Sequence, residues 1–217
     1  ALKKCMEALQ RRDRKAAAQA LGPQLQEVPL TCKVALMTRH KCFLGLGDLP
    51  HALHDLGAYL KLSGPSKEGV TAVLRFARGF QTAREAVKQI RVLSRHASAQ
   101  DPIWRVLEGQ IFTQHGEGKP ALAAFASALK ADPSFYEANH ERSHLYLKLG
   151  KPDLALADAE ICLKATPDIV HFQLMGGDAA AALGQRERAV ALFEQAADKG
   201  NPREQQHARA QLAKLKK

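Results

Sequence analysis

The chain has 217 residues, of which 46% are hydrophobic and only 6% aromatic, and its formal net charge is +10. This length allows one or two globular domains or one repeat array, and an Ala- and Leu-rich composition with few rings favours closely packed helices. The sequence contains no run of about 18 apolar residues, so we expect no transmembrane segment. The first residues lack the apolar stretch of a signal peptide and do not begin with Met, so we expect a trimmed or missing N-terminal segment.

The positive charge is confined to the first half of the chain. Residues 1–100 contain 17 Lys and Arg against 7 Asp and Glu, whereas residues 101–217 contain 15 of each kind. The four cysteines, Cys5, Cys32, Cys42 and Cys162, fit neither a metal-binding spacing nor a disulfide-rich scaffold. We expect reduced, buried thiols, which favours a cytoplasmic location.

Two helix pairs are predicted in the first third of the chain. Residues 1–32 form a degenerate pair, because apolar residues recur at helical spacing from Leu2 to Leu25 while the intervening turn contains no glycine. Residues 33–66 fit a helix-turn-helix unit better. Gly47 supplies its turn, and Pro50 falls at the start of the second helix, where proline is tolerated.

Residues 67–101 are predicted to form an irregular pair. Val73 and Phe80 belong to the apolar face of its first helix, and Ile90 and Leu93 to that of its second. Gly79 lies two residues earlier than the turn glycine of the other pairs. We expect the second helix to run to about residue 96.

From residue 102 one pattern recurs three times, over residues 102–135, 136–169 and 170–202. Pro133, Pro167 and Pro202 each follow a helical run, at spacings of 34 and 35 residues. Each unit carries a turn glycine where a left-handed backbone is needed: Gly116, Gly150 and Gly184. Small and aromatic residues recur on one face of each second helix, where they allow two helices to approach closely: Ala121, Phe125 and Ala128, then Ala155, Ala159 and Cys162, then Ala189, Phe193 and Ala196.

Residues 203–217 are predicted to form one more helix. Ala208, Leu212 and Leu215 would face inward, and polar residues would face outward. A single helix with a polar outer face is the cap that ends an array of stacked repeats.

The small, aromatic and proline residues named above resemble the tetratricopeptide-repeat family, which places them in this order over about 34 residues. The match is good for roughly half the chain. The resemblance implies an all-α fold, a right-handed α-solenoid of about six helix-turn-helix repeats with a C-terminal capping helix, so that residues 1–217 form a single solenoid. It also implies that the first helix of each pair lines a concave groove.

The exposed positions of those first helices predict the residues that bind a partner. They are Met37, Lys41, Leu44, Thr71, Arg75, Arg78, Val106, Gln110, Thr113, Glu137, His140, His144, His171, Leu174 and Asp178. The predicted groove is basic toward the N-terminus and mixed toward the C-terminus. Arg75 and Arg78 offer forked donors to a carboxylate or a phosphate.

These residues favour a non-enzymatic scaffold or adaptor that holds an extended or helical acidic segment of a protein partner, with no cofactor. The alternative is a nucleic-acid-binding array, because basic residues concentrate between residues 75 and 96. Rings for base stacking are few there, since Phe76 and Phe80 are the only local aromatic residues and at least one should be buried. Homo-oligomers are a further possibility, because Met37, Leu44 and Val106 are expected to be exposed apolar residues.

His140-Glu141-Arg142-Ser143-His144 has the HExxH pattern of zinc metalloproteases, in which two His one helical turn apart bind the metal and the Glu acts as base. A catalytic zinc needs a third protein ligand. Glu160, the nearest carboxylate in the arrangement the pattern resembles, is expected on the outer helix of the same pair, away from both His. We therefore predict neither a metal site nor a catalytic residue, and keep zinc binding helped by His171 as a remote alternative.

Overall fold

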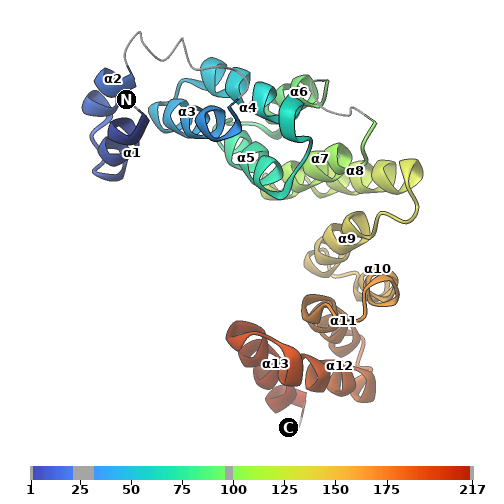
Figure 1. Cartoon of the computed structure of the whole chain (residues 1–217). Coiled ribbons are helices and arrows are strands. Elements are labelled where there is room, and N and C mark those ends of the chain that lie inside the picture. The colour runs from blue at the N-terminus through green and yellow to red at the C-terminus, as the bar shows by residue number, and fades with distance from the viewer. Residues whose placement is uncertain (1, 22–31, 96–99, 216–217) are drawn as a thin grey trace. The chain divides into compact units, whose positions relative to one another are not determined.

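The computed structural model describes residues 2–21, 32–95 and 100–215, and every regular element in these ranges is an α-helix (Figure 1). The helices are α1 (Leu2–Gln10), α2 (Arg14–Leu21), α3 (Lys33–Leu46), α4 (Leu49–Ser63), α5 (Lys67–Ala77), α6 (Ala83–Ser94), α7 (Ile103–Gln114), α8 (Gly118–Ala131), α9 (Tyr136–Lys148), α10 (Pro152–Ala165), α11 (Val170–Ala182), α12 (Arg186–Lys199) and α13 (Pro202–Leu215). The predicted all-α fold is confirmed. None of the described helices is both long and apolar enough to cross a membrane. The predicted helical residue Leu25 lies outside the described ranges.

The chain forms two compact units, unit 1 (Ala1–His115) and unit 2 (Gly116–Lys217). In unit 1, helices α3 to α7 share a core that includes the fully buried Leu56, Phe76 and Ile90. In unit 2, helices α10 to α13 share a core around Phe193 and Ala208. The boundary between the units falls within residues 102–135, which the sequence predicts as one pair. A single solenoid over residues 1–217 therefore stays a prediction.

The predicted turn glycines adopt the left-handed conformation. Their φ angles are 82° at Gly47, 76° at Gly116, 67° at Gly150 and 70° at Gly184. At Gly150 the N–H donates to the carbonyl of Leu147 at 3.1 Å, and the next N–H, of Lys151, donates to the carbonyl of Tyr146 at 2.9 Å. This pair of bonds is the Schellman motif, which satisfies carbonyls that the end of a helix leaves without partners. The same two bonds recur at Gly47 and Gly184.

The irregular pair α5 and α6 turns differently. Gly79 has no positive φ, and a Cβ built on it would lie 3.1 Å from Leu49 Cδ2 and 3.2 Å from the carbonyl oxygen of Phe76. Its glycine is therefore explained by close packing rather than by a left-handed turn. Helix α6 begins after Thr82, whose hydroxyl accepts a hydrogen bond from the N–H of Glu85. It ends at Ser94, and His96 lies outside the described residues.

The small residues permit the close helix contacts that the sequence predicts. All nine of the recurring residues on the second helices of the last three predicted pairs are completely buried: Ala121, Phe125, Ala128, Ala155, Ala159, Cys162, Ala189, Phe193 and Ala196. The closest contact is on α11, where a Cβ built on Gly177 would lie 2.6 Å from Phe193 Cε1 on α12. Any larger residue at position 177 would therefore have to push the buried ring aside.

Helix α13 ends the array as predicted. It packs against α11 and α12, with Ala208 buried and Leu212 and Leu215 against the core of unit 2. Its outer residues, such as Arg209, are exposed. The last helix thus covers the apolar face that α11 and α12 would otherwise leave to solvent.

The cysteine prediction is correct for three of four thiols. Cys5, Cys42 and Cys162 are buried and free, but Cys32 is exposed, since it precedes the first turn of α3 and does not lie on its packed face. Burial raises the pKa of the Cys42 and Cys162 thiols to about 12, so both are protonated at neutral pH. The cytoplasmic location stays a prediction.

We expect Gly177→Ala to lower the free energy of unfolding by roughly 1–3 kcal/mol, because the added methyl group overlaps the ring of Phe193 in a fully packed core. The matched control is the neighbouring Gly176→Ala. Its Cβ would lie 3.2 Å from Leu163 Cδ1 and from Leu192 Cδ1, flexible side-chain ends that can yield, and 3.8 Å from Ala159 Cβ, which is ordinary van der Waals contact. The control should therefore be neutral, or stabilising by up to about 1 kcal/mol through helix propensity. Urea and thermal unfolding followed by far-ultraviolet circular dichroism measures both, and equal effects would contradict the packing explanation.

Candidate functional site

Helices α3 and α5, the first helices of two successive pairs in unit 1, line an open hollow of about 440 Å³. We call it the α3–α5 hollow. Its lining residues are Met37, His40, Lys41, Lys67, Glu68, Thr71, Ala72 and Arg75. Met37, Lys41, Thr71 and Arg75 are among the predicted groove residues, and the other four are not. Lys67 and Glu68 were missed because they belong to the first turn of α5, one turn before the positions that the repeat pattern marks.

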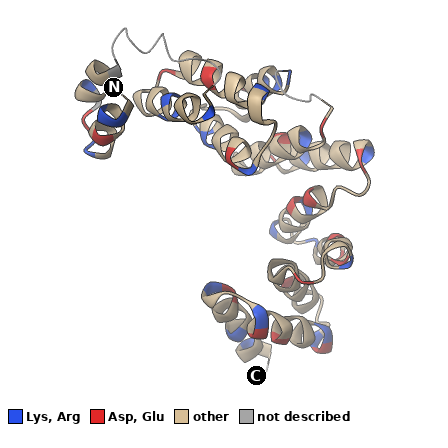
Figure 2. Cartoon of the chain, in the orientation of Figure 1, with Lys and Arg blue, Asp and Glu red and all other residues tan. Residues whose placement is uncertain are grey.

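Positive charge dominates the α3–α5 hollow. Lys41, Lys67 and Arg75 line it against the single carboxylate of Glu68. Lys41 Nζ lies 3.5 Å from Glu68 Oε1, and Tyr59 donates a hydrogen bond to Glu68 Oε2 at 3.2 Å. The carboxylate is thus held at one side, and among the described residues no ion pair engages Lys67 or Arg75. Lys67 and Arg75 are therefore available to an anionic ligand. Figure 2 marks the Lys and Arg positions along the backbone in blue.

His40 lies beside these cations and is completely buried. Its Nδ1 donates to the carbonyl oxygen of Ala52 at 2.8 Å, so in the neutral ring Nε2 is an acceptor. Burial lowers the pKa of His40, which keeps the ring neutral at pH 7. Nε2 is buried and has no hydrogen-bond partner within the described part of the chain. A buried acceptor without a donor is uncommon in a native structure.

An ion pair holds α3 in place behind the α3–α5 hollow. Arg39 donates two hydrogen bonds to Asp55 on α4, Nε to Oδ2 at 2.7 Å and Nη2 to Oδ1 at 2.6 Å, and both residues are buried. The equivalent pair in unit 2 joins α9 to α10, where Arg142 donates to Asp158 at 2.7 Å twice. Such two-point contacts fix the rotation of the first helix relative to the second.

Three predicted groove residues are buried, and their predicted exposure is wrong. Met37 is 3% exposed, Val106 2% and Leu174 7%. Met37 belongs to the core of unit 1 and Leu174 to that of unit 2, because removing apolar area from water is favourable by about 25 cal/mol per Å² wherever a neighbouring helix is within reach. Leu44 is half-buried against the unit 1 core. Met37 and Val106 are therefore not exposed apolar residues that a second copy of the chain would cover.

The remaining predicted residues are dispersed. Arg78 is exposed just after α5 and does not line the α3–α5 hollow. On α7, Gln110 is half-buried, and Thr113 donates to the carbonyl of Gly109 in its own helix. Asp178 on α11 accepts hydrogen bonds from His207 and Gln211 and so connects α11 to α13. Glu137 is half-buried at the start of α9.

A second basic surface lies on α6. Arg84, Lys88, Arg91 and Arg95, the α6 stripe, are spaced by four, three and four residues and are all exposed. With Val87, Val92 and Phe112 they line a hollow of about 430 Å³. Arg91 is engaged in two hydrogen bonds to Glu108 on α7, at 2.9 and 2.8 Å. As expected, one of the two local rings, Phe76, is buried, and Phe112 is a further ring that packing on α7 brings to this surface.

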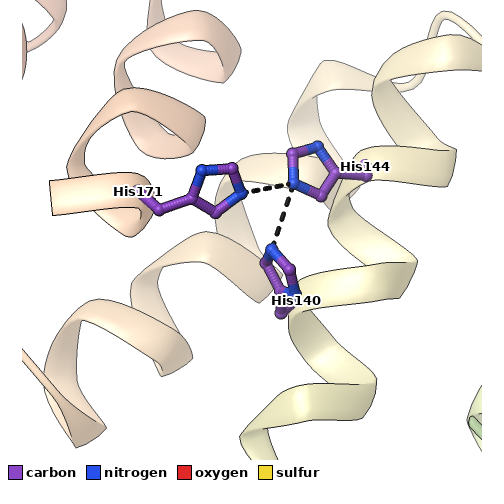
Figure 3. Close-up of side chains that lie close together, drawn as sticks. All are labelled: His140, His144 and His171. Carbon is purple, nitrogen blue, oxygen red and sulfur yellow. Dashed lines mark hydrogen bonds between the residues drawn. The ribbon is translucent and has the colours of Figure 1, made fainter. Parts of the chain in front are cut away.

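Three histidines meet in unit 2. His140 and His144 lie one turn apart on α9, and His171 lies in the first turn of α11 (Figure 3). His144 Nε2 is 3.1 Å from His140 Nε2 and 3.0 Å from His171 Nε2, and the three ring nitrogens all lie within 4.8 Å of one another. His140 and His144 are half-buried and His171 is exposed. We call these three residues the histidine cluster.

Two of the three histidines in the cluster, His144 and His171, have lowered pKa values, which favours their neutral forms. Burial and the neighbouring His140 and His171 lower the pKa of His144 to about 4, and burial with His140 lowers the pKa of His171. Glu141 Oε1 lies 3.5 Å from His140 Nδ1, the ring nitrogen that does not face the other histidines. Glu160 lies on α10, as expected, and pairs with Arg188 on α12. The cluster therefore does not have the ligand set that the HExxH pattern resembles.

Residues 140–204 match the family model of the tetratricopeptide repeat. The fold is shared with solved structures, among them the following three. One is YrrB, described as a tetratricopeptide-repeat protein with an unusual peptide-binding site, with a TM-score of 0.55 and 15% identity, covering 97% of this chain and 100% of that one. PilW, a type IV pilus biogenesis factor, has a TM-score of 0.52 and 18% identity, covering 88% of each chain. MamA from Desulfovibrio magneticus RS-1 has a TM-score of 0.51 and 22% identity, covering 59% of this chain and 72% of that one.

The recurring hairpins with left-handed turn glycines and small residues at the helix contacts define a helical repeat protein. The family match and the shared fold confirm the resemblance that the sequence predicts. Residues 140–204 thus match the tetratricopeptide-repeat family, and the chain as a whole shares the fold of solved helical repeat structures.

We expect Asp55→Ala to destabilise the protein by roughly 3–5 kcal/mol, because it leaves the buried guanidinium of Arg39 without its carboxylate. The control is Asp168→Ala, whose exposed carboxylate lies 3.8 Å from Lys199 Nζ and should contribute no more than about 1 kcal/mol. Chemical denaturation of the full chain gives both values. A destabilisation by Asp55→Ala no larger than that of the control would show that the buried pair does not hold the helices together.

Proposed function

We propose that this protein is a non-enzymatic interaction module that binds an extended acidic segment of a partner protein in the α3–α5 hollow. The observation that carries the proposal is the charge of the lining residues, since Lys41, Lys67 and Arg75 face one carboxylate, Glu68. The volume of about 440 Å³ falls within the range of roughly 300–1,000 Å³ that is typical of ligand sites. Concave surfaces of this kind are what helical repeat proteins present to their partners.

The chemistry of the α3–α5 hollow suits a peptide backbone with acidic side chains. Arg75 presents a planar fork of donors that matches a carboxylate at two points. Buried apolar atoms of Met37 and Ala72 form part of the lining and suit the aliphatic part of a segment. A bound peptide also brings backbone N–H donors, the kind of group that His40 Nε2 lacks. YrrB, which shares this fold, is described as having a peptide-binding site, and this supports a segment as the ligand.

We propose a non-enzymatic protein because the HExxH segment, the one pattern in the sequence that suggests an enzyme, does not have the geometry of a zinc protease. The base of a zinc protease must face the water bound to the metal, on the Nε2 side of the histidines. Here the carboxylate of Glu141 lies beside His140 Nδ1, and Glu160 is paired with Arg188. We therefore assign no catalytic role to Glu141.

The test uses the full chain and two labelled peptides of extended sequence, one alternating Glu with apolar residues and one with Lys in place of Glu. We expect the acidic peptide to bind, and Arg75→Glu to weaken its binding at least tenfold, which corresponds to about 1.4 kcal/mol. The control is Arg203→Glu on α13, which changes the net charge equally at an exposed position outside the α3–α5 hollow. Fluorescence anisotropy gives the affinities. An equal decrease in both variants, or preference for the Lys peptide, would contradict the proposal.

A second candidate function is nucleic-acid binding, which the α6 stripe favours. Its cations recur about once per helical turn beside the ring of Phe112, and phosphates together with bases are ligands for such a surface. Because Arg91 already pairs with Glu108, Arg84 and Lys88 are the residues to change.

If the α6 stripe binds single-stranded RNA, Lys88→Glu should weaken binding of a labelled oligonucleotide several-fold. It should also reduce the slope of log affinity against log salt by roughly 0.7 for each phosphate that the variant no longer neutralises. Arg75→Glu should leave this binding unchanged. The crossed pair of variants thus separates the two functions, since a peptide site in the α3–α5 hollow is weakened by Arg75→Glu and unaffected by Lys88→Glu.

A further inference from the structure

The histidine cluster brings three nitrogen atoms to one point, and hydrogen bonding alone does not account for it. A neutral imidazole carries one ring proton, so each Nε2 either donates one hydrogen bond or accepts one. His144 Nε2 contacts the Nε2 atoms of both His140 and His171, at 3.1 and 3.0 Å. Either two acceptors share one proton, or two donors share the single lone pair of His144 Nε2, or one of the contacts sets two lone pairs against each other. In each case the two contacts of His144 Nε2 are not both full hydrogen bonds.

A metal cation at the same point would accept all three lone pairs. With Zn–N bonds of about 2.0–2.1 Å and tetrahedral angles, ligand nitrogens lie ~3.3–3.4 Å apart. The separations of His144 Nε2 from its two neighbours are a few tenths of an ångström shorter, and the third separation, between His140 and His171, is within 4.8 Å (Figure 3). Rotation of the rings about their side-chain bonds would bring the three nitrogens to the spacing that the ion requires. We propose that His140, His144 and His171 bind a divalent transition-metal ion, Zn²⁺ foremost, through their Nε2 atoms.

The backbone preorganises this site. His140 and His144 project from one face of α9, one turn apart, and α9 packs against α11, which carries His171. Phe172 follows His171 and is buried, and its ring centroid lies 5.4 Å from that of His140. The first turn of α11 is thus anchored beside α9, and His171 is held over the other two histidines.

Every residue of the segment His140-Glu141-Arg142-Ser143-His144 then has a role without catalysis. Arg142 pairs with Asp158, and Ser143 donates to the carbonyl of Ala155 at 2.8 Å, so that both fix the rotation of α9 against α10. Glu141 lies beside Nδ1 of His140, where a carboxylate favours the tautomer with its lone pair on Nε2. The two histidines supply ligands, and the other three residues orient them.

Three histidines leave one coordination position of a tetrahedral ion open. Because His171 is exposed and the other two are half-buried, that position would be open to solvent water. Imidazole nitrogen suits Zn²⁺, Cu²⁺ and Ni²⁺, whereas Mg²⁺ and Ca²⁺ prefer oxygen, so the site should discriminate against the last two. The histidine cluster shares no residue with the α3–α5 hollow, so this proposal can be tested independently of the proposed function.

The test uses the full chain without a polyhistidine tag, stripped with a chelator and titrated with Zn²⁺ by calorimetry. We expect one ion per chain, visible absorption of a tetrahedral complex with Co²⁺, and no binding of Mg²⁺. His171→Ala and His144→Ala should each weaken Zn²⁺ binding by at least about 100-fold, which is more than the roughly 10–100-fold that outer-shell changes cause. Glu141→Gln should weaken it by about tenfold.

The control is His115→Ala, which removes an exposed histidine from the end of α7 and should leave Zn²⁺ affinity unchanged. Circular dichroism checks that each variant folds, and His171→Ala removes an exposed side chain, so it tests the site even if His144→Ala unfolds. Zn²⁺ should raise the melting temperature of the wild type and not that of His171→Ala. The proposal is overturned if the wild type binds no Zn²⁺, which would make the cluster a packing contact, or if His171→Ala binds Zn²⁺ as tightly as the wild type.

Discussion

The structure depends on how closely the two helices of each hairpin approach each other. Completely buried alanines and Gly177 allow this approach, and the contact between Gly177 and Phe193 leaves no room for a methyl group. Only at such short separations do polar side chains of one helix reach the backbone and carboxylates of the next. Arg39 reaches Asp55 and Arg142 reaches Asp158, both across 16 residues of sequence. His40 and Ser143 reach the carbonyls of Ala52 and Ala155, both across 12 residues. The same two contacts thus recur in units 1 and 2.

These contacts explain where the candidate sites lie. An Arg on the first helix that is fixed at two points on the second determines which face of the first helix remains open. On α3 that face carries Lys41, which meets Lys67 and Arg75 of α5 at the α3–α5 hollow. On α9 it carries His140 and His144, which meet His171 of α11. In both units the candidate site is formed by the first helices of two successive pairs. The packing that stabilises these helices therefore also brings the residues of the site together.

The sequence predicts the parts of this structure that local rules determine. A left-handed turn needs glycine, a close helix contact needs a small residue, and an end cap needs a polar outer face, so Gly150, Ala189 and α13 were all predicted correctly. The exposure of Met37, Val106 and Leu174 was predicted wrongly. It depends on how far a neighbouring helix covers each position, and a local sequence pattern contains no information about that coverage. Lys67 and Glu68 lie outside the repeat positions that the pattern marks, and their place in the hollow follows from the packing of α5 beside α3. The pairing of His140 with His144 follows from helical spacing, whereas the approach of His171 depends on the packing of α11 against α9.

One polar nitrogen at each of the two candidate sites has incomplete hydrogen bonding. Buried polar atoms are almost always satisfied in native proteins, and strained or unsatisfied groups concentrate at sites that bind something. His40 Nε2 is a buried acceptor without a donor beside the basic lining of the α3–α5 hollow. His144 Nε2 faces two further nitrogens that one proton cannot satisfy. His40 Nδ1 has a structural role, since it donates to the carbonyl of Ala52, so only Nε2 is left without a partner. Gln110 Oε1, Asn139 Oδ1 and Gln173 Oε1 are also buried without a partner, so an unsatisfied atom does not by itself mark a site. His40 and His144 differ because each lies among further groups that could bind a ligand, the basic lining at His40 and two more imidazoles at His144.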